Sequence, residues 1–270
     1  MKKTELIMGM PITVEVVESG LITSAPYDRA AFGADEDGGF SDYGKAIAEV
    51  MDFFRAVDAK FSTYKTDSEI SLINRGLIEK DKYSPAMREI FDMAEETKRL
   101  TDGYFDIVNR QGLIDPSGIV KGWAIFRASK ILDRHGLANH YVEAGGDIQT
   151  RGLNGSGKKW RVGIRDPFNR TEIVKVLALS GQGVATSGTY IRGQHIYNPK
   201  KKTEKIEEIV SLTVVGPDIY EADRMATAAF AMGSKGIEFI EKYSGLEGYM
   251  IDRNGIATLT GGFERYVRSE

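Results

Sequence analysis

The stretch Ala222-Asp223-Arg224-Met225-Ala226-Thr227-Ala228 places a carboxylate and a hydroxyl four residues apart among small residues. Residues four apart lie on one face of an α-helix, so Asp223 and Thr227 are expected to point the same way. Oxygen ligands suit Mg²⁺ better than Zn²⁺, and Mg²⁺ usually keeps waters and a substrate phosphate in its shell. The segment therefore predicts half of a magnesium site for a phosphorylated ligand. An ordinary solvated helix turn is the alternative interpretation.

The composition is that of an ordinary globular protein and narrows the possible chemistry. The 270 residues are 41% hydrophobic and 28% charged, with a formal net charge of -3, which argues against a nucleic-acid binder driven by bulk charge. The sequence has no cysteine, which excludes thiolate ligands, disulfides and a cysteine nucleophile. Reactive groups must therefore be oxygen and nitrogen side chains.

The sequence shows neither a membrane span nor a signal peptide. No apolar run approaches the roughly 18 residues that cross a membrane. Residues 1–17 alternate polar and apolar side chains, which predicts a strand. We expect no membrane span in this chain and a cytoplasmic location; an exported or membrane-anchored protein whose leader has been removed is the alternative.

Periodic segments along the chain predict the α+β class, with antiparallel sheets flanked by helices. Helices are expected over residues 47–61, from Ser84 and Pro85 to near Gly103, over 121–135, around Asp223 and Thr227 as far as Gly233, and over 237–243. Strands are expected over residues 141–150, 160–164, 173–179, 184–186 and 209–215, with a hairpin over 249–259 turned at Asn254-Gly255. No repeat or linker divides the chain.

Four further segments combine glycine with carboxylates, hydroxyls or imidazole. They are residues 101–106 (TDGYFD), 114–122 (IDPSGIVKG), 143–147 (EAGGD) and 185–199 (ATSGTYIRGQHIYNP). The second predicts a turn that offers backbone amides to phosphate before a helix. The two glycines of the third predict a bulge, or a close backbone approach, within a strand. In the fourth, His195 is the best of the three histidines as a general base.

In this order, the motifs resemble those of the ApbE family, FAD:protein FMN transferases that move FMN from FAD onto a protein threonine. The resemblance covers nearly the whole chain. It rests on residues 8–10 (MGM), 61–74 (FSTYKTDSEISLIN), 102–106, 115–122, 144–147, 186–188, 195–196 and 222–228. Each motif alone is weak, and the specificity comes from their order.

The resemblance implies an ApbE-like, T-fold-like architecture and a single flavin transferase domain over residues 1–270. It implies that Mg²⁺ is held by the Asp223 carboxylate, the Thr227 hydroxyl and the Gly118 backbone carbonyl. The implied FAD pocket comprises Met8, Tyr64, Tyr104, Phe105, Asp106, Asp115, Lys121 and Ile196. These residue types fit the assignment, because aromatic rings suit flat ligands and a lysine suits phosphate.

The implied reaction is attack of a threonine hydroxyl, carried by an acceptor flavoprotein, on the FMN-side phosphorus of FAD, with AMP leaving. Asp223 and His195 are then the catalytic residues, Asp223 through Mg²⁺ and His195 as the candidate base for the hydroxyl. Three alternatives stay open: an Mg²⁺-dependent FAD pyrophosphatase giving FMN and AMP, a non-catalytic FAD-binding protein, and a plain α+β scaffold.

The sequence departs from the family at two points. Members are often exported lipoproteins that carry a lipidated cysteine, and this sequence has no cysteine. Phe126 stands where the family often has an aspartate at the end of its K-G-x-x-x-D run, which leaves the adenine side of the implied pocket less defined.

Overall fold

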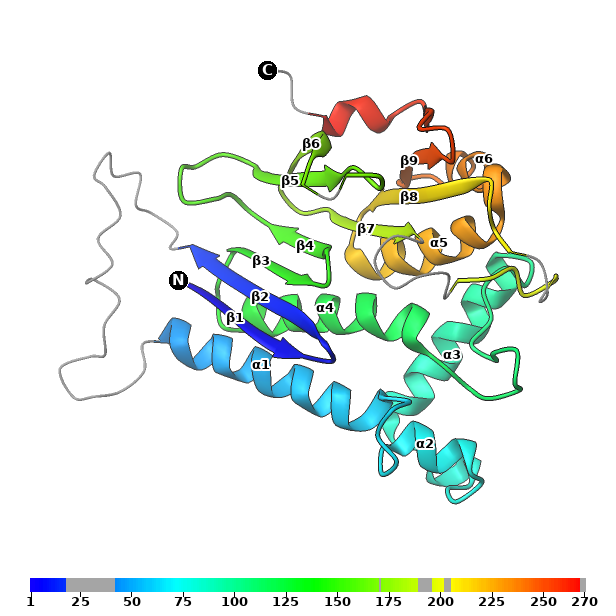
Figure 1. Ribbon diagram of the computed structural model, residues 1–270. Helices are drawn as coiled ribbons and strands as arrows, with labels where there is room; N and C mark the ends of the chain where they lie inside the picture. The colour runs from blue at the N-terminus through cyan, green and yellow to red at the C-terminus, as the bar shows by residue number, and fades with distance from the viewer. Residues whose placement is uncertain (18–41, 170, 189–195, 202–204, 268–270) are drawn as a thin grey trace.

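The computed structural model describes residues 1–17, 42–169, 171–188, 196–201 and 205–267 (Figure 1). The strands are β1 (Lys2–Ile7), β2 (Met10–Val17), β3 (Asn139–Ala144), β4 (Asp147–Arg151), β5 (Trp160–Arg165), β6 (Ile173–Leu179), β7 (Gly183–Gly188), β8 (Ile209–Gly216), β9 (Glu247–Asp252) and β10 (Ala257–Leu259). The helices are α1 (Asp42–Phe61), α2 (Glu69–Asn74), α3 (Pro85–Leu100), α4 (Ser117–Arg134), α5 (Ile219–Ala231) and α6 (Gly236–Glu241). Short 3₁₀ turns include Phe263–Tyr266 near the end of the described chain.

The central element is an eight-stranded sheet in the order β1-β2-β3-β4-β7-β8-β9-β10. Each neighbouring pair of these strands is antiparallel. Strands β5 and β6 form a separate antiparallel pair. The expected α+β class, with antiparallel sheets and flanking helices, is confirmed.

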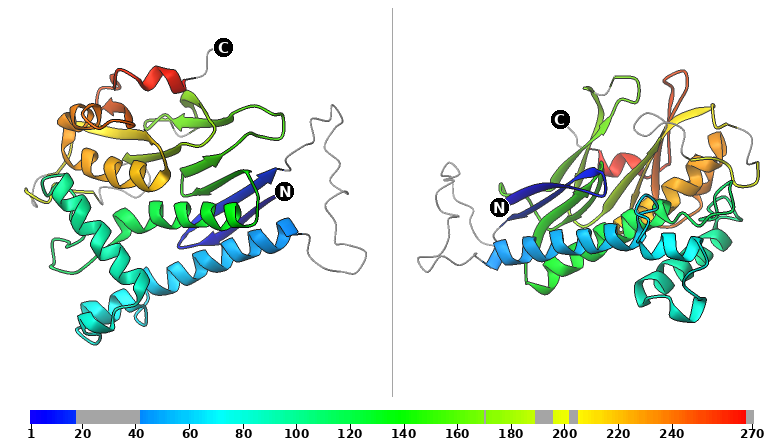
Figure 2. Two further views of the ribbon diagram at one scale, coloured as in Figure 1. Left: turned by 180° about the vertical axis from the view of Figure 1, so that it is seen from behind. Right: turned by 60° about the horizontal axis from the view of Figure 1, so that its bottom comes forward.

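The large sheet is covered on both faces. Helices α1, α4 and α5 lie on one face, and the β5–β6 pair lies on the other (Figures 1 and 2). Two buried clusters correspond to these layers, and adjacent residues of β8 divide between them: Val214 packs with the helices, whereas Val215 packs with Leu177 and Phe263. This division follows from the strand period of two, because successive side chains point to opposite faces.

Local sequence signals account for the long helices. The apolar stripe of α1 is buried at Ile47, Val50 and Phe54. Helix α3 starts as expected, with the Ser84 hydroxyl accepting from the Met87 N–H at 3.3 Å. Helix α5 starts at an Asp218 cap, whose carboxylate accepts from the Glu221 N–H at 2.9 Å. No helix in the described part of the chain combines the length and apolar character that crossing a bilayer requires.

Two predicted strands are hairpins, so these predictions were wrong. Residues 1–17 turn at Met8 and Gly9, with φ of 56° and 71°, and pair as β1 and β2. Residues 141–150 turn at Gly145 and Gly146, with φ of 60° and 99°, which places Ala144 opposite Asp147. Two consecutive residues at positive φ form the tight turns of hairpins, so the glycine pair reverses the chain and is not a bulge.

The predicted start of the third long helix was also wrong. Helix α4 begins at Ser117 and not at Lys121. Its first backbone hydrogen bonds run from the Ile119 and Val120 N–H groups to the Pro116 carbonyl, at 3.0 Å each. The glycine-containing segment expected to be a turn is therefore the first turn of the helix, and it carries Gly118 and Lys121 as helical residues.

Candidate functional site

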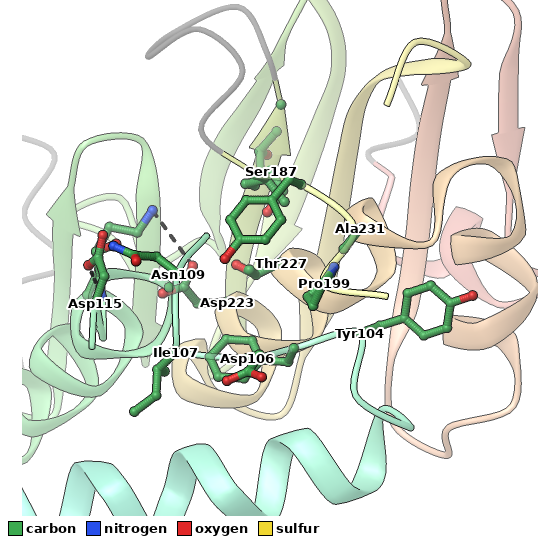
Figure 3. Close-up of a pocket in the computed structure, with 18 of the residues that line it drawn as sticks. Tyr104, Asp106, Ile107, Asn109, Asp115, Ser187, Pro199, Asp223, Thr227 and Ala231 are labelled. Atoms are coloured by element: carbon green, nitrogen blue, oxygen red, sulfur yellow. Dashed lines mark hydrogen bonds and ion pairs between the residues drawn. The ribbon is translucent and has the colours of Figure 1, made fainter. Parts of the chain in front are cut away.

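A pocket opens where the loop after α3, the first turns of α4, the end of β7 and the middle of α5 meet (Figure 3). Nine of the residues singled out in the sequence line it: Tyr104, Phe105, Asp106, Asp115, Gly118, Lys121, Ile196, Asp223 and Thr227. In Figure 3, Asp223 and Thr227 lie between Asn109 and Asp115 on one side and Tyr104 and Ala231 on the other. Segments far apart in sequence are thus brought to one cavity.

Asp223 is buried at the centre of the site, with only 4% of its surface exposed. Its Oδ2 accepts a hydrogen bond from the backbone N–H of Gly122 at 2.8 Å. Its Oδ1 lies 3.7 Å from Nζ of Lys121. Lys121 Nζ also forms an ion pair with Oδ2 of Asp147. Two carboxylates therefore share one ammonium group.

The buried carboxylates of Asp223 and Asp147 face a single ammonium group, that of Lys121. Burial raises the pKa of Asp223 to about 7; the Lys121 ammonium opposes this rise, and the Asp147 carboxylate adds to it. One ammonium against two carboxylates leaves an excess negative charge when both acids are ionised. Because Coulomb interactions are stronger in a low-dielectric interior, such a site favours a cation.

The oxygen atoms around Asp223 are those expected for Mg²⁺. Thr227 lies one turn further along α5, and Gly118 of α4 lies beside it, since a Cβ on Gly118 would be 3.3 Å from Cγ2 of Thr227. Carboxylate, hydroxyl and carbonyl oxygens are hard donors that suit Mg²⁺. Among the described residues, no group of three or more His, Cys, Asp or Glu side chains forms an alternative metal cluster.

Asp147 was not among the site residues predicted from the sequence. Its Oδ1 accepts from the Thr186 N–H at 3.0 Å, and its Oδ2, which makes no hydrogen bond, pairs with Lys121. It is the first residue of β4, directly after the Gly145-Gly146 turn. The Gly-Gly-Asp motif was the available signal, and recognising a hairpin there would have directed attention to the aspartate. The lining also contains Ser117, Ser187 and Tyr197, which lie in the segments singled out in the sequence but were given no role, and Ile107 and Asn109, which sequence reasoning missed.

The loop after α3 is shaped by its own hydrogen bonds. The Thr101 hydroxyl accepts from the Phe105 N–H at 3.1 Å. Asp106 accepts from the Val108 N–H at 2.9 Å and forms an ion pair with Lys98 at 2.9 Å. These contacts hold the buried Phe105 ring against Gly118, since a Cβ there would lie 3.3 Å from the ring.

Residues 196–201 contact the loop after α3 through four interactions, which together we call the clasp. Lys200 Nζ lies 2.5 Å from Oδ2 of Asp102 and 4.4 Å from the centre of the Tyr104 ring. The Tyr197 hydroxyl donates to the Val108 carbonyl at 3.3 Å, and the Arg110 guanidinium lies 4.6 Å from the centre of the Tyr197 ring. The clasp keeps Ile196 and Tyr197 in the pocket wall.

Two predicted site residues are not in this lining, and a third cannot be placed. Met8 is half-buried at the β1–β2 turn, and Tyr64 is 96% exposed; neither lines the pocket. His195 lies outside the described residues. Their proposed roles stay predictions.

Solved structures of similar fold span nearly the whole chain. The flavin transferase ApbE of Vibrio cholerae aligns over 98% of both chains, with a TM-score of 0.79 and 21% identity. The ApbE protein of Thermotoga maritima aligns over 100% of this chain and 99% of its own, with a TM-score of 0.81 and 20% identity. At these identities the likeness establishes the fold.

Curated relatives carry the name FAD:protein FMN transferase. The Escherichia coli (strain K12) protein is 30% identical over 151 residues, which are 53% of this chain and 43% of that protein. The Haemophilus influenzae protein is 26% identical over 280 residues, covering 79% of this chain and 81% of its own. The chain thus spans less than half the length of the first of these two. The sequence model of the ApbE family matches residues 8–112 and 108–250, and the chain therefore belongs to the ApbE family.

Proposed function

We propose that this chain, as a single domain over residues 1–270, transfers FMN from FAD to a threonine hydroxyl of an acceptor flavoprotein in an Mg²⁺-dependent reaction. The observation that carries the proposal is the convergence of Asp223, Thr227, Gly118 and Lys121 in one pocket of an ApbE-family chain. The curated name shared by its relatives supports the same activity.

The residues of the pocket fit Mg²⁺ and a pyrophosphate together. Asp223, Thr227 and the Gly118 carbonyl would hold the ion, because all three supply hard oxygen donors and the surrounding charge is negative. Bound Mg²⁺ would neutralise negative charge on the phosphate oxygens of FAD. Lys121 would add a point charge for phosphate, positioned by Asp147.

The remaining lining would bind and orient the ligand. Tyr104 and Phe105 offer aromatic surface to a flat ring system. Asp115 is held at the start of α4, where its carboxylate accepts from the Ser117 N–H at 3.1 Å. Fixing the pyrophosphate in line with the incoming hydroxyl would supply much of the rate increase, since phosphoryl transfer depends mainly on positioning and charge stabilisation.

The proposed chemical step is one displacement at phosphorus. The threonine oxygen forms a bond to the FMN-side phosphorus, the bond from that phosphorus to the bridging oxygen breaks, and AMP leaves with the bridging oxygen. The hydroxyl proton passes to a base, for which His195 is the candidate. With water as the nucleophile, the same site would release FMN and AMP.

The test is to incubate the purified chain with FAD and Mg²⁺, with and without a threonine-bearing acceptor domain. AMP release and the acceptor mass are followed, with EDTA as the metal-free control. A gain of one FMN on the acceptor that requires Mg²⁺ supports the transferase. AMP release without a mass gain replaces it with a pyrophosphatase, and neither signal replaces it with a flavin-binding protein.

A further inference from the structure

Gly122 lies where α4 packs directly against α5 beside the site. A Cβ atom built on Gly122 would be 2.6 Å from Cβ of Asp223 and 2.9 Å from its Oδ2, and 2.9 Å from the carbonyl oxygen of Ile219. Real Cβ atoms essentially never approach other atoms this closely, so a larger residue would force the helices apart. Glycine inside a helix costs roughly 0.5–1 kcal/mol relative to alanine. Alanine at position 122 would therefore favour the helix by itself but would clash with α5.

The contact that Gly122 permits is a hydrogen bond to a carboxylate. Its N–H donates to Oδ2 of Asp223 at 2.8 Å, between residues 101 positions apart. A hydrogen bond to an ionised acceptor is roughly twice as strong as one between neutral groups. It therefore fixes Oδ2 and leaves Oδ1, which faces Lys121 at 3.7 Å, as the oxygen for a cation.

The same N–H is the one that α-helix geometry assigns to the carbonyl of Gly118, four residues earlier. An acceptor that this N–H reaches must therefore lie close to the Gly118 carbonyl oxygen, so the bond to Oδ2 brings the Asp223 carboxylate beside that oxygen. Gly118 lies in the first turn of α4, and its carbonyl oxygen has two lone pairs, so it can accept a helical hydrogen bond and still ligate a cation.

We propose that Gly122 is a positioning residue of the metal site. Its N–H orients the Asp223 carboxylate beside the Gly118 carbonyl, and its lack of a side chain allows the two helices to meet. The inference rests on the proposed function, because it takes Asp223, Thr227 and Gly118 as the Mg²⁺ ligands.

The first test is a Mn²⁺ titration of Gly122→Ala, followed by the EPR signal of free Mn²⁺. We expect affinity at least tenfold weaker than in the wild-type chain. The matched control is Gly236→Ala on α6, where the new Cβ would lie 2.1 Å from the carbonyl oxygen of Ala229 on the same helix α5. The control should lower the melting temperature and keep the Mn²⁺ affinity within about twofold. Wild-type affinity in Gly122→Ala, or equal weakening in both variants, would overturn the inference.

The second test does not require Gly122→Ala to fold. Labelling lysine with ¹³C at the carbonyl and glycine with ¹⁵N selects Lys121-Gly122 and Lys235-Gly236, the two Lys-Gly pairs in the sequence. In Asp223→Asn, we expect the Gly122 amide proton to move upfield, because its charged acceptor is lost, and the Gly236 signal to stay in place. An unmoved Gly122 signal would overturn the inference.

Different results would disprove the proposed metal site and the proposed role of Gly122. If the wild-type chain binds no Mn²⁺ and Asp223→Ala leaves FAD turnover unchanged, the proposed metal site is wrong. If the wild-type chain binds Mn²⁺ and Gly122→Ala binds it equally well, only the role of Gly122 is wrong.

Discussion

Lys121 of α4 and Asp147 of β4 form an ion pair that joins the helical layer to the sheet beside the pocket. Asp147 is 2% exposed and is also anchored by the Thr186 N–H at 3.0 Å. The pair sets where the Lys121 ammonium lies relative to Asp223, and so it controls the charge of the site.

Asp147→Asn is expected to destabilise the fold by about 1–2 kcal/mol, because the Lys121 ammonium loses the nearer of its two carboxylates and keeps only Asp223, 3.7 Å away. Urea unfolding measures the change. The matched control is Asp102→Asn, which removes the partner of Lys200 from a side chain that is 92% exposed, and exposed pairs contribute little. Equal losses of stability in the two variants would contradict the structural role of Asp147.

Asp223→Ala is expected to reduce Mg²⁺-dependent FAD turnover to background while the chain stays folded, because the variant loses the one carboxylate among the proposed ligands. Steady-state AMP release and circular dichroism together measure this. Full activity in a folded variant would remove Asp223 from the metal site.

The stability of the metal-free chain should fall as pH rises from about 4 to about 7. Burial raises the pKa of Asp223 from 3.8 to about 7, so the folded state binds a proton that the unfolded state has released across this range. Asp223→Asn should remove this contribution. The comparison is unfolding free energy against pH for both chains in EDTA, and parallel curves would show that Asp223 ionises normally in the folded state.

Lys200→Met is expected to raise the KM for FAD several-fold with little change in melting temperature. The substitution removes the ion pair with Asp102 and the contact with the Tyr104 ring, which loosens the clasp at the pocket wall. Lys158→Met, at an exposed position after β4, is the control. An unchanged KM for FAD would show that the clasp does not shape the binding site.

His195→Ala is expected to lower kcat far more than it weakens FAD binding, because a general base acts on the incoming hydroxyl and not on the bound flavin. Steady-state kinetics with the acceptor domain, paired with FAD titration of the same variant, separate the two quantities. A loss confined to FAD affinity would remove His195 as the base.

Local patterns predicted the parts of the fold that local forces determine. The apolar stripe of α1 and the Ser84-Pro85 start of α3 are decided within a few residues of sequence, and both were predicted. The start of α4 was misplaced because Gly118 and Gly122 lower helix propensity, whereas tertiary packing against α5 compensates for it. The hairpin at Gly145-Gly146 was interpreted as a bulge because glycines at a bulge and glycines at a hairpin turn both interrupt the alternating pattern of a strand.

The distinction between features set by local sequence and features set by tertiary packing also applies to the site. Asp223 and Thr227 lie four residues apart on one helix, so their shared direction was predictable from spacing. The pairing of Lys121 with Asp147 joins two layers of the fold, and the bond from Gly122 to Asp223 joins residues 101 positions apart. No local period encodes such contacts, so they emerge only from the packing of α4 against both the sheet and α5.

The most direct test of the account is a crystal structure of the chain with FAD and Mn²⁺, in which anomalous scattering locates the ion. The account predicts one Mn²⁺ within about 2.2 Å of an Asp223 carboxylate oxygen, the Thr227 hydroxyl and the Gly118 carbonyl, beside the pyrophosphate. An ion held elsewhere, or FAD bound with no ion touching Asp223, would contradict it.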